Sequence, residues 1–226
     1  MSYFITGTDT GVGKTLVSCA LLNAFAAQGK RVAGFKPVAA GCDADDRNED
    51  AKLLSAASTV RATYGQINPY CFPRAIAPHL AARHAGTRID LPRIMASYRE
   101  LAGQTDEVIV EGVGGFCVPL NEKLDSADLA KEIGLPVILV VRMRLGCINH
   151  ALLTLRVIAD YQLECAGWVA NVLDADMPSL QENIQTLRER IAAPLLGVIP
   201  HMVEPDMKVA ASCLDLGLLG APLAER

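Results

Sequence analysis

Short apolar runs alternate along the chain with longer stretches in which apolar residues recur every three or four positions. Short runs bounded by polar or turn residues are typical of buried strands, whereas the wider spacing is typical of helices that bury one face. We therefore predict strands at residues 3–6, 31–35, 107–110, 136–141, 167–170 and 195–199.

The helical spacing is clearest from Val17 to Phe25, and Gly29 follows as a stop. Further helices are predicted at about residues 50–57, 91–101, 126–133, 148–161 and 179–191. Strands that alternate with helices predict an α/β fold with a doubly wound, mostly parallel sheet. No composition break or long linker divides the chain, so we expect a single domain over residues 1–226.

Doubly wound sheets bind ligands in the crevice beyond the carboxyl ends of their strands. The residues that follow each predicted strand are therefore the first candidates for a site, namely residues 7–15, Lys36, 111–115, 142–150, Asn171 and Pro200. Residues 42–86 are less regular, because Pro69, Pro73 and Pro78 interrupt them. We expect a loop-rich insertion over the site there.

Composition and charge narrow the classes of partner. Apolar residues make up 51% of the chain and charged residues 20%, and the formal net charge is −4. This balance is globular, and Lys and Arg form no basic stripe for nucleic acid. The longest apolar run, residues 135–141, is too short to span a membrane, and no apolar leader precedes the first strand. We expect a cytoplasmic protein with small-molecule partners.

Seven cysteines lie far apart in the sequence without a C-x-x-C pair, so neither a zinc knuckle nor a disulfide framework is predicted. The odd count favours a reducing compartment. His79 and His84 lack a Ser, Cys or carboxylate partner motif, and we interpret them, like His150 and His201, as structural or surface residues.

The strongest chemical signal is the segment Gly-Thr-Asp-Thr-Gly-Val-Gly-Lys-Thr at residues 7–15, between a strand and a helix. Backbone N–H groups from Gly11 to Leu16 can point at phosphate oxygens, aided by the positive end of the helix. Lys14 would lie near the β and γ phosphates, and the Thr15 hydroxyl could ligate Mg²⁺. The loop is a variant, because Gly7 lies one place early and Thr8 occupies the position of the first glycine.

Two further charged positions end strands. Lys36 is followed by Pro37, which keeps it extended, so its ammonium should project over the carboxyl edge unless it is an ordinary strand-end lysine. Glu111 precedes Gly112-Val113-Gly114-Gly115, where backbone amides can approach a ligand. A capping or solvated glutamate is the alternative. The acidic residues 43–50 are typical of a solvated loop, and their spacing does not select a metal ligand.

The assembled motifs resemble those of dethiobiotin synthetase, the biotin-synthesis enzyme that closes the ureido ring. The resemblance covers about residues 3–202 and rests on the segments at 7–15, 36–39 (Lys-Pro-Val-Ala), 47–50 (Arg-Asn-x-Asp), 110–115 (Val-Glu-Gly-x-Gly-Gly), 145–150 (Leu-Gly-Cys-Ile-Asn-His), 167–171 (Gly-Trp-Val-Ala-Asn) and 194–200 (Pro-Leu-Leu-Gly-x-Ile-Pro). It implies a P-loop NTPase fold.

The resemblance also implies roles for individual residues. Mg²⁺ would be ligated by Thr15, Asp50 and Glu111, and the catalytic lysines would be Lys36 and Lys14. ATP would be the co-substrate. Asn171 would recognise the adenine, and the base and ribose would be lined by Pro200, His201, Met202 and Asp206. The other residues expected to contact ATP are Gly11, Val12, Gly13, Lys14, Thr15, Leu16, Asp50, Glu111, Gly112, Val113 and Gly114.

The implied second substrate is 7,8-diaminopelargonate, at Thr10, Lys36 and Ala40. The implied assembly is a homodimer, in which the helix start at Gly146, Cys147, Ile148 and Asn149 receives the carboxylate of the substrate bound in the neighbouring subunit. Two departures concern this substrate. Many members have serine where this chain has Ala40, and a tyrosine expected near Asn183 is missing.

The implied reaction joins CO₂ or bicarbonate to one amine as a carbamate, which ATP phosphorylates before the second amine closes the ring. A P-loop switch or partitioning ATPase is the alternative, but its signature lysine, five residues before Lys14, is here Asp9. A metal-delivery ATPase would need clustered cysteines, and amidotransferase synthetases need an additional glutaminase domain.

Overall fold

The computed structural model describes residues 2–220. Within that range six parallel strands form one sheet in the order β2-β5-β1-β6-β7-β8. Their bounds are β1 Tyr3–Gly7, β2 Val32–Phe35, β5 Glu107–Glu111, β6 Val137–Arg142, β7 Cys165–Asn171 and β8 Leu195–Ile199. The predicted mostly parallel α/β sheet is confirmed, and each of the six predicted strands is present with ends that differ by two residues at most.

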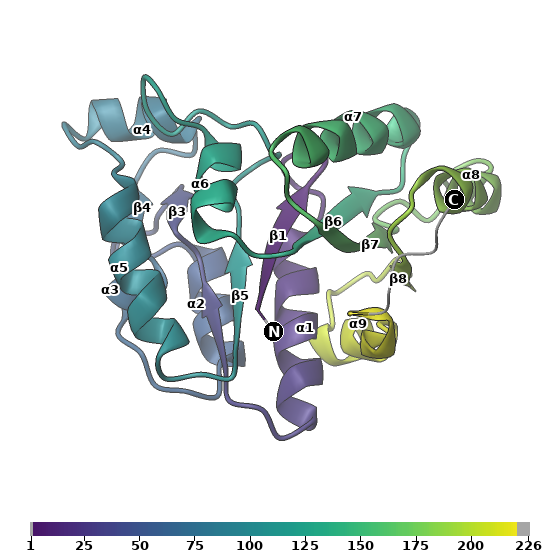
Figure 1. Cartoon of the computed structure of the whole chain (residues 1–226), viewed down its shortest axis with the longest axis horizontal. Helices are drawn as coiled ribbons and strands as arrows, with labels where there is room; N and C mark the ends of the chain where they lie inside the picture. Colours follow the sequence, from purple (N-terminus) through teal and green to yellow (C-terminus); the bar gives the residue numbers. More distant parts are fainter. Residues whose placement is uncertain (1, 221–226) are drawn as a thin grey trace.

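Helices cover both faces of this sheet (Figure 1). One face packs against α1 (Lys14–Ala27), α2 (Glu49–Ala57) and α9 (Met207–Ser212). The other carries α5 (Leu91–Ala102), α6 (Ser126–Ile133), α7 (Cys147–Asp160) and α8 (Leu180–Arg190). From β1 the chain first adds β2 and β5 on one side and then β6, β7 and β8 on the other, so β1 lies where the strand order reverses.

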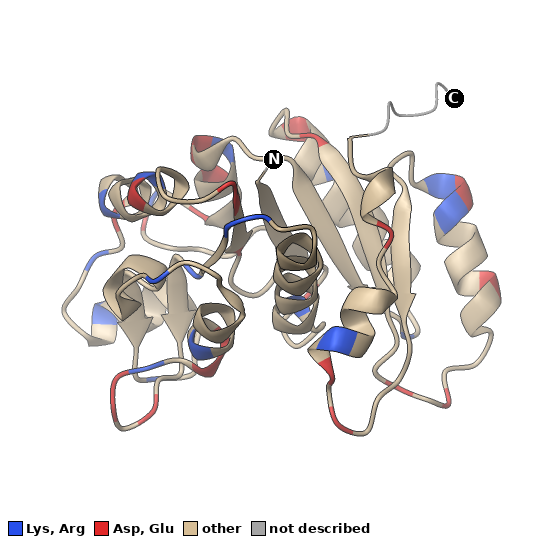
Figure 2. Ribbon diagram, turned by 90° about the horizontal axis from the view of Figure 1, so that it is seen from below, with Lys and Arg blue, Asp and Glu red and all other residues tan. Residues whose placement is uncertain are grey.

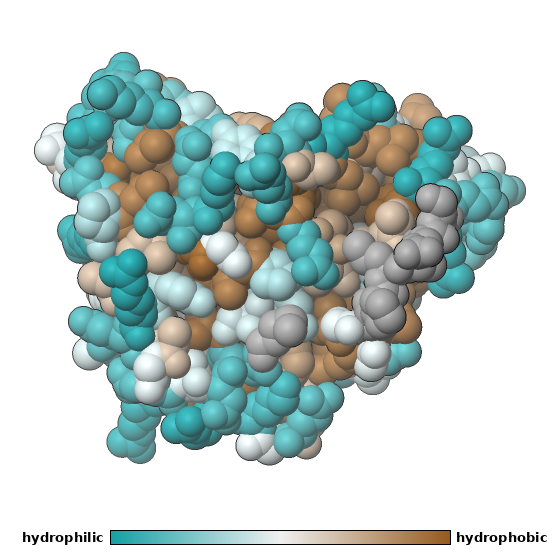
Figure 3. Space-filling model, viewed as in Figure 1, coloured by the Kyte–Doolittle hydropathy of each residue, from teal (hydrophilic) through white to brown (hydrophobic). Residues whose placement is uncertain are grey.

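Alternating side chains of each strand divide the core between the two faces, as the two-residue period of a strand requires. Ile5 and Ile138 pack against the α1 face, whereas Phe4 and Val137 pack against the opposite one. Lys, Arg, Asp and Glu gather on the outer helices and loops (Figure 2). Apolar residues nevertheless reach the surface on the face shown in Figure 3, between polar residues at its margins.

The segment between β2 and α5 is more regular than we predicted. Residues 42–86 were expected to form a loop-rich insertion, but besides α2 they contain α3 (Tyr64–Ile67), β4 (Tyr70–Phe72) and α4 (Pro78–His84). β4 pairs in parallel with β3 (Val38–Ala40), which begins directly after Pro37. α9 and the short helix η1 (Leu216–Leu218) were also missed, because elements of three to seven residues carry too little periodicity.

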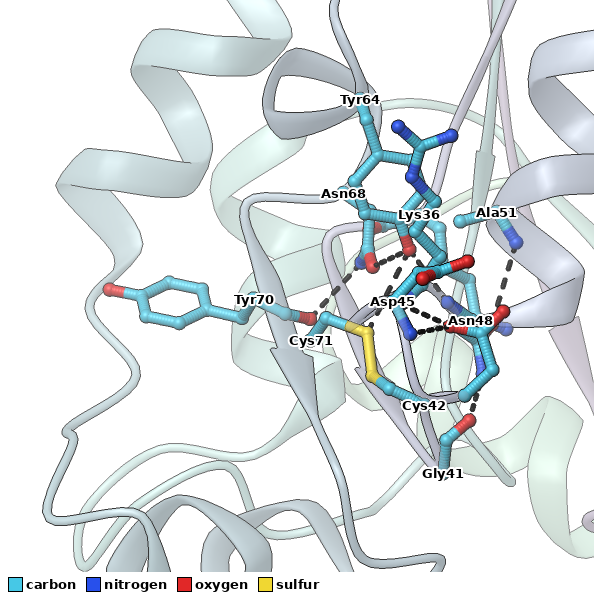
Figure 4. Close-up of a disulfide and its surroundings, with 12 residues drawn as sticks. Lys36, Gly41, Cys42, Asp45, Asn48, Ala51, Tyr64, Asn68, Tyr70 and Cys71 are labelled. Atoms are coloured by element: carbon cyan, nitrogen blue, oxygen red, sulfur yellow. Dashed lines mark hydrogen bonds between the residues drawn. A yellow bond between two sulfur atoms is a disulfide. The ribbon is translucent and has the colours of Figure 1, made fainter.

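Cys42 and Cys71 form a disulfide, although the spacing of the cysteines did not indicate a disulfide framework (Figure 4). The pairing of β3 with β4 places Ala39 opposite Cys71, and the Gly41 N–H donates to the Phe72 carbonyl at 2.8 Å. Cys42 therefore leaves β3 beside Cys71, with 6.4 Å between their Cα atoms. Sequence spacing alone did not indicate this contact, because the two cysteines are 29 residues apart.

None of the helices within residues 2–220 combines the length and apolar character needed to cross a membrane.

Gly197 of β8 provides a test of the packing at this edge of the sheet. A Cβ at Gly197 would lie 2.0 Å from the carbonyl oxygen of Cys213, which follows α9. We expect Gly197→Ala to lower the free energy of unfolding by about 1–3 kcal/mol, the usual cost of overpacking. Urea denaturation measures the change. Gly65→Ala is the matched control, since a Cβ at Gly65 meets nothing within 4 Å and alanine favours helix. Equal stability of both variants would contradict the described contact.

Candidate active site

The loop between β1 and α1 forms one wall of the site. Gly11 and Gly13 have φ of 69° and 90°, which favours glycine at both positions. A Cβ at Gly13 would also fall 2.0 Å from Nδ2 of Asn171. α1 begins at Lys14 with no side chain capping its first turn, so its backbone N–H groups remain available to an anion. Leu16 lies in that first turn.

Lys14 lies almost entirely within the protein, and its Nζ donates to the carbonyl of Asp9 at 3.1 Å. Burial lowers the pKa of Lys14 to about 8, and the positive charge of Lys36 acts in the same direction. Glu111 and Asp50 partly oppose this shift. Because the charge is weakly compensated by the protein, the position favours an anionic ligand.

Three oxygen-bearing side chains meet beside Lys14. The Thr15 Oγ1 lies 2.8 Å from Oδ1 of Asp50 and 2.9 Å from Oε1 of Glu111. These residues come from α1, α2 and the end of β5. The single hydroxyl hydrogen can be donated to one carboxylate at a time, which leaves excess acceptor capacity. Oε2 of Glu111 is buried without a hydrogen-bond partner among the described residues. Such a set of oxygens suits a hard divalent cation.

Lys36 joins the same cluster from the end of β2. Its Nζ lies 2.6 Å from Oε1 of Glu111 and 2.8 Å from Oδ2 of Asp50, and the side chain is 4% exposed. Burial alone would lower the pKa of Lys36, but the two carboxylates outweigh it and the pKa is raised. Burial likewise opposes ionisation of Asp50, yet Lys36 lowers the pKa of Asp50 overall. Lys36 and Asp50 therefore hold each other in their charged forms.

A cavity of about 330 Å³ contains this cluster. Predicted site residues that line it are Thr10, Gly11, Gly13, Lys14, Thr15, Lys36, Ala40, Asp50, Glu111, Val113 and Gly114. Gly114, with φ of 63°, lies against the first loop, since a Cβ there would come 3.3 Å from Oγ1 of Thr10. Gly112 contributes its carbonyl, 3.4 Å from the Lys36 Nζ. The carboxyl ends of the parallel strands thus bring residues from three separate motifs into one cavity, as expected for a doubly wound sheet.

Sequence reasoning did not select three residues that also line the cavity, namely Ala39, Asn48 and Leu173. Asn48 caps α2 by accepting the Ala51 N–H at 3.4 Å. An asparagine immediately before a helix with acidic residues in its first turn is a recognisable capping signal. That signal could have identified Asn48, whereas Ala39 and Leu173 carry no comparable one.

The residues expected around the base lie outside the lining of this cavity. Asn171 is fully buried at the end of β7, and its Nδ2 donates to the carbonyl of Val12 at 2.8 Å. Pro200 and His201 are exposed after β8, and Met202 is half-buried. His201 Nδ1 lies 3.1 Å from the Leu173 carbonyl. Asp206 accepts the Lys208 and Val209 N–H groups through Oδ1, which caps α9.

Gly146, Cys147, Ile148 and Asn149 also lie outside the cavity lining, at the start of α7. Gly146 has φ of 91°, and no side chain caps the first turn of this helix. The neighbouring Leu145 is 97% exposed. Within one chain these residues contribute nothing to the cavity, so a role in it would require a second copy.

Solved structures similar to this chain include the septum site-determining protein MinD complexed with Mg-ADP from Pyrococcus horikoshii, with a TM-score of 0.55 and 19% identity over 95% of this chain and 87% of that chain. Cobyrinic acid a,c-diamide synthase from Mycobacterium smegmatis, with a bound ATP analogue and magnesium, gives a TM-score of 0.54 and 19% identity over 93% and 91% of the two chains. These likenesses confirm the P-loop NTPase fold.

Sequence comparison identifies the family. A protein-family model described as an AAA domain matches residues 1–206. The ATP-dependent dethiobiotin synthetase BioD of Nitrosospira multiformis is 52% identical over 96% of both chains. That of Aromatoleum aromaticum is 52% identical over 95% of this chain and 97% of its own length. The chain therefore belongs to the family of ATP-dependent dethiobiotin synthetases.

Proposed function

We propose that this chain converts 7,8-diaminopelargonate and CO₂ to dethiobiotin at its Lys36 site, with release of ADP and phosphate, in biotin biosynthesis. The activity is that of an ATP-dependent carbon–nitrogen cyclo-ligase, in keeping with the family. The observation that carries the proposal is the position of Lys36, between Glu111 and Asp50 and in the same cavity as Lys14. The reaction is proposed to take place in the cytoplasm.

We propose that the ATP phosphates bind to the loop between β1 and α1 and to the start of α1. The uncapped N–H groups of the helix and the buried ammonium of Lys14 favour an anion there. For the base, Asn171 is the proposed reader, because its Oδ1 is buried without a partner among the described residues and could accept an exocyclic amino hydrogen. Pro200, His201, Met202 and Asp206 would flank base and ribose.

Mg²⁺ is the proposed metal, because the oxygen set of Thr15, Asp50 and Glu111 fits a hard cation. When bound, Mg²⁺ would supply charge neutralisation for the phosphates. Within the described residues no cluster of three or more His, Cys, Asp or Glu side chains could hold a metal, so phosphate and water would complete the coordination. The two structural neighbours were solved with magnesium and a nucleotide or nucleotide analogue, which is consistent with this assignment.

The chemistry needs no protein nucleophile. One amine of the substrate takes up CO₂ as a carbamate, the carbamate attacks the γ phosphorus of ATP with ADP leaving, and the second amine displaces phosphate as the ring closes. The chain must offset the repulsion between an anionic carbamate and the triphosphate. Lys14 and Lys36 are the cations placed to do so, because preorganised charge is worth most in a water-poor site.

The substrate is proposed to lie near Thr10, Lys36 and Ala40, which share the cavity. Ala40 offers no hydroxyl, so the substrate's polar contacts must come from elsewhere. We propose a homodimer in which Gly146 to Asn149 of one copy receive the carboxylate bound by the other. The exposed Leu145 and Leu153 fit this arrangement, since apolar side chains 97% and 57% exposed are suited to burial against a partner.

The proposed activity predicts a strict co-substrate requirement. Phosphate release from ATP should need 7,8-diaminopelargonate and bicarbonate together, because the acceptor is the carbamate formed from both. A coupled phosphate assay with each component omitted in turn measures this. Release at the full rate with neither component would indicate a simple ATPase and contradict the proposal.

Lys36→Gln should lower kcat by about a hundredfold or more, the scale of losing one preorganised electrostatic contact. The KM for ATP should change less, because a transition-state contact appears in kcat. Steady-state kinetics with all substrates supplied measures both constants. Lys52→Gln is the control, since Lys52 pairs with Asp43 in an exposed position. A Lys36→Gln enzyme with near-normal kcat would leave the electrostatic role to Lys14.

Shared sites predict complementation between two defective variants. Asn149→Asp should repel the substrate carboxylate in trans, and Lys36→Gln should disable the chemistry in cis. A mixed dimer would then contain one site with neither defect. Mixing the two variants after subunit exchange should restore part of the activity that each lacks alone. Failure to restore activity while sedimentation shows mixed dimers would contradict the shared site.

A further inference from the structure

Beside the charged cluster, a chain of hydrogen bonds connects α3 and the residue that follows it to Asn48 and to the backbone of Lys36 (Figure 4). At its centre is the hydroxyl of Tyr64 on α3. This hydroxyl accepts the backbone N–H of Asn48 at 2.7 Å and donates to Oδ1 of Asn68 at 3.0 Å. A second possible acceptor, Sγ of Cys71, lies 3.7 Å away. One oxygen thus links the start of α2 to the residue that follows α3.

The first segment delivers Asp50. Asn48 is the N-cap of α2, and Asp50 lies in the first turn of that helix. Nδ2 of Asn48 also donates to the carbonyl of Gly41 at 3.0 Å. The contact with Tyr64 holds the backbone at the point where the helix begins, so it fixes the direction in which Asp50 projects.

The second segment delivers Lys36. Asn68 is 3% exposed, and its Nδ2 donates to the Lys36 carbonyl at 2.6 Å and to the Tyr70 carbonyl at 3.0 Å. The backbone N–H of Lys36 in turn donates to the Ile67 carbonyl at 2.8 Å. The peptide groups on both sides of Lys36 are therefore held by residues 67 and 68, and Asn68 is oriented by Tyr64.

We propose that Tyr64 is a positioning residue for catalysis, because its hydroxyl sets Asp50 and Lys36 relative to each other without touching either side chain. The two side chains meet at 2.8 Å, and each is placed by a segment that Tyr64 holds. This proposal rests on the proposed function in that it assigns Asp50 to the metal and Lys36 to the reacting phosphoryl group.

The test compares Tyr64→Phe with Tyr70→Phe. Each substitution removes one hydroxyl that accepts a backbone N–H, and the Tyr70 hydroxyl accepts that of Asp90 at 3.0 Å, before α5 and away from the cluster. We expect Tyr64→Phe to lower kcat by about 10- to 100-fold, the range for outer-shell partners of metal ligands. Tyr70→Phe should stay within about twofold of the wild type. Unfolding in urea, measured for both, shows how far each effect is structural.

Two further readouts separate positioning from loss of structure. In a Lys36→Gln background the additional effect of Tyr64→Phe on kcat should shrink several-fold, because residues that act as a unit are not additive. Titration calorimetry with Mg-ADP should show weaker binding for Tyr64→Phe than for Tyr70→Phe. The wild type and all variants are assayed under one redox condition. Thiol titration checks that the Cys42–Cys71 bond is in the same state in each of them.

Equal kcat values for Tyr64→Phe and Tyr70→Phe, at equal folded fractions, would overturn the proposal. An undiminished effect of Tyr64→Phe in the Lys36→Gln background would overturn it as well. If the wild-type chain fails to form dethiobiotin, the proposed function fails, but the positioning of Asp50 is still decided by the Mg-ADP affinities. Equal affinities of the two variants would then exclude it.

Discussion

A lysine ammonium that is withdrawn from water must be paired, because an uncompensated buried charge costs several kcal/mol. Lys36 meets this requirement with Glu111 at 2.6 Å and Asp50 at 2.8 Å. Burial lowers the pKa of Lys36 and attraction to the two carboxylates raises it. The attraction is the larger effect, so the pKa is raised overall. Such a cluster is weak evidence for stability, since apolar residues of similar volume often stabilise a core as well or better. The presence of the cluster is better explained by chemistry that needs charges held in fixed places.

The cluster follows from the order of the strands. β2, β5 and β1 are neighbours in the sheet, and their carboxyl ends deliver Lys36, Glu111 and the first loop to one edge. Thr15 and Glu111 are 96 positions apart in sequence, yet their oxygens lie 2.9 Å apart. A parallel sheet brings all carboxyl ends to the same edge, so residues distant in sequence meet there.

How much of this could be read from the sequence differs between elements. Long periodic helices and apolar strands gave their approximate bounds, and the loop at residues 7–15 gave its chemistry through glycine and lysine spacing. β3 and β4 were missed because three residues are too few to show a period. The Cys42–Cys71 bond depends on the pairing of those strands, so it was missed with them.

The site shows the same limit. Strand-end position indicated Lys36 and Glu111, but the spacing of the acidic residues did not indicate that Asp50 would pair with Lys36. The placement of the cluster depends on Asn48 and Asn68, two polar residues in a segment broken by prolines. Buried amides of this kind carry no periodic signal. Only the tertiary structure reveals that their hydrogen bonds connect the backbone segments behind the cavity.

The shift of the first glycine in the loop has a structural reason. Gly7 ends β1, and a Cβ there would lie 2.4 Å from Cγ2 of Val12. Its absence lets Val12 turn inward to 1% exposure in the core beneath α1. The loop is thus anchored by an apolar side chain from below and by the Asn171 Nδ2, which donates to the Val12 carbonyl at 2.8 Å. The N–H groups that follow need no part in holding the loop, so they stay free for phosphate. The side-chain amide of Asn171 would then serve two purposes, with Nδ2 fixing the loop and Oδ1 facing a base. Base recognition and phosphate binding would therefore be mechanically coupled.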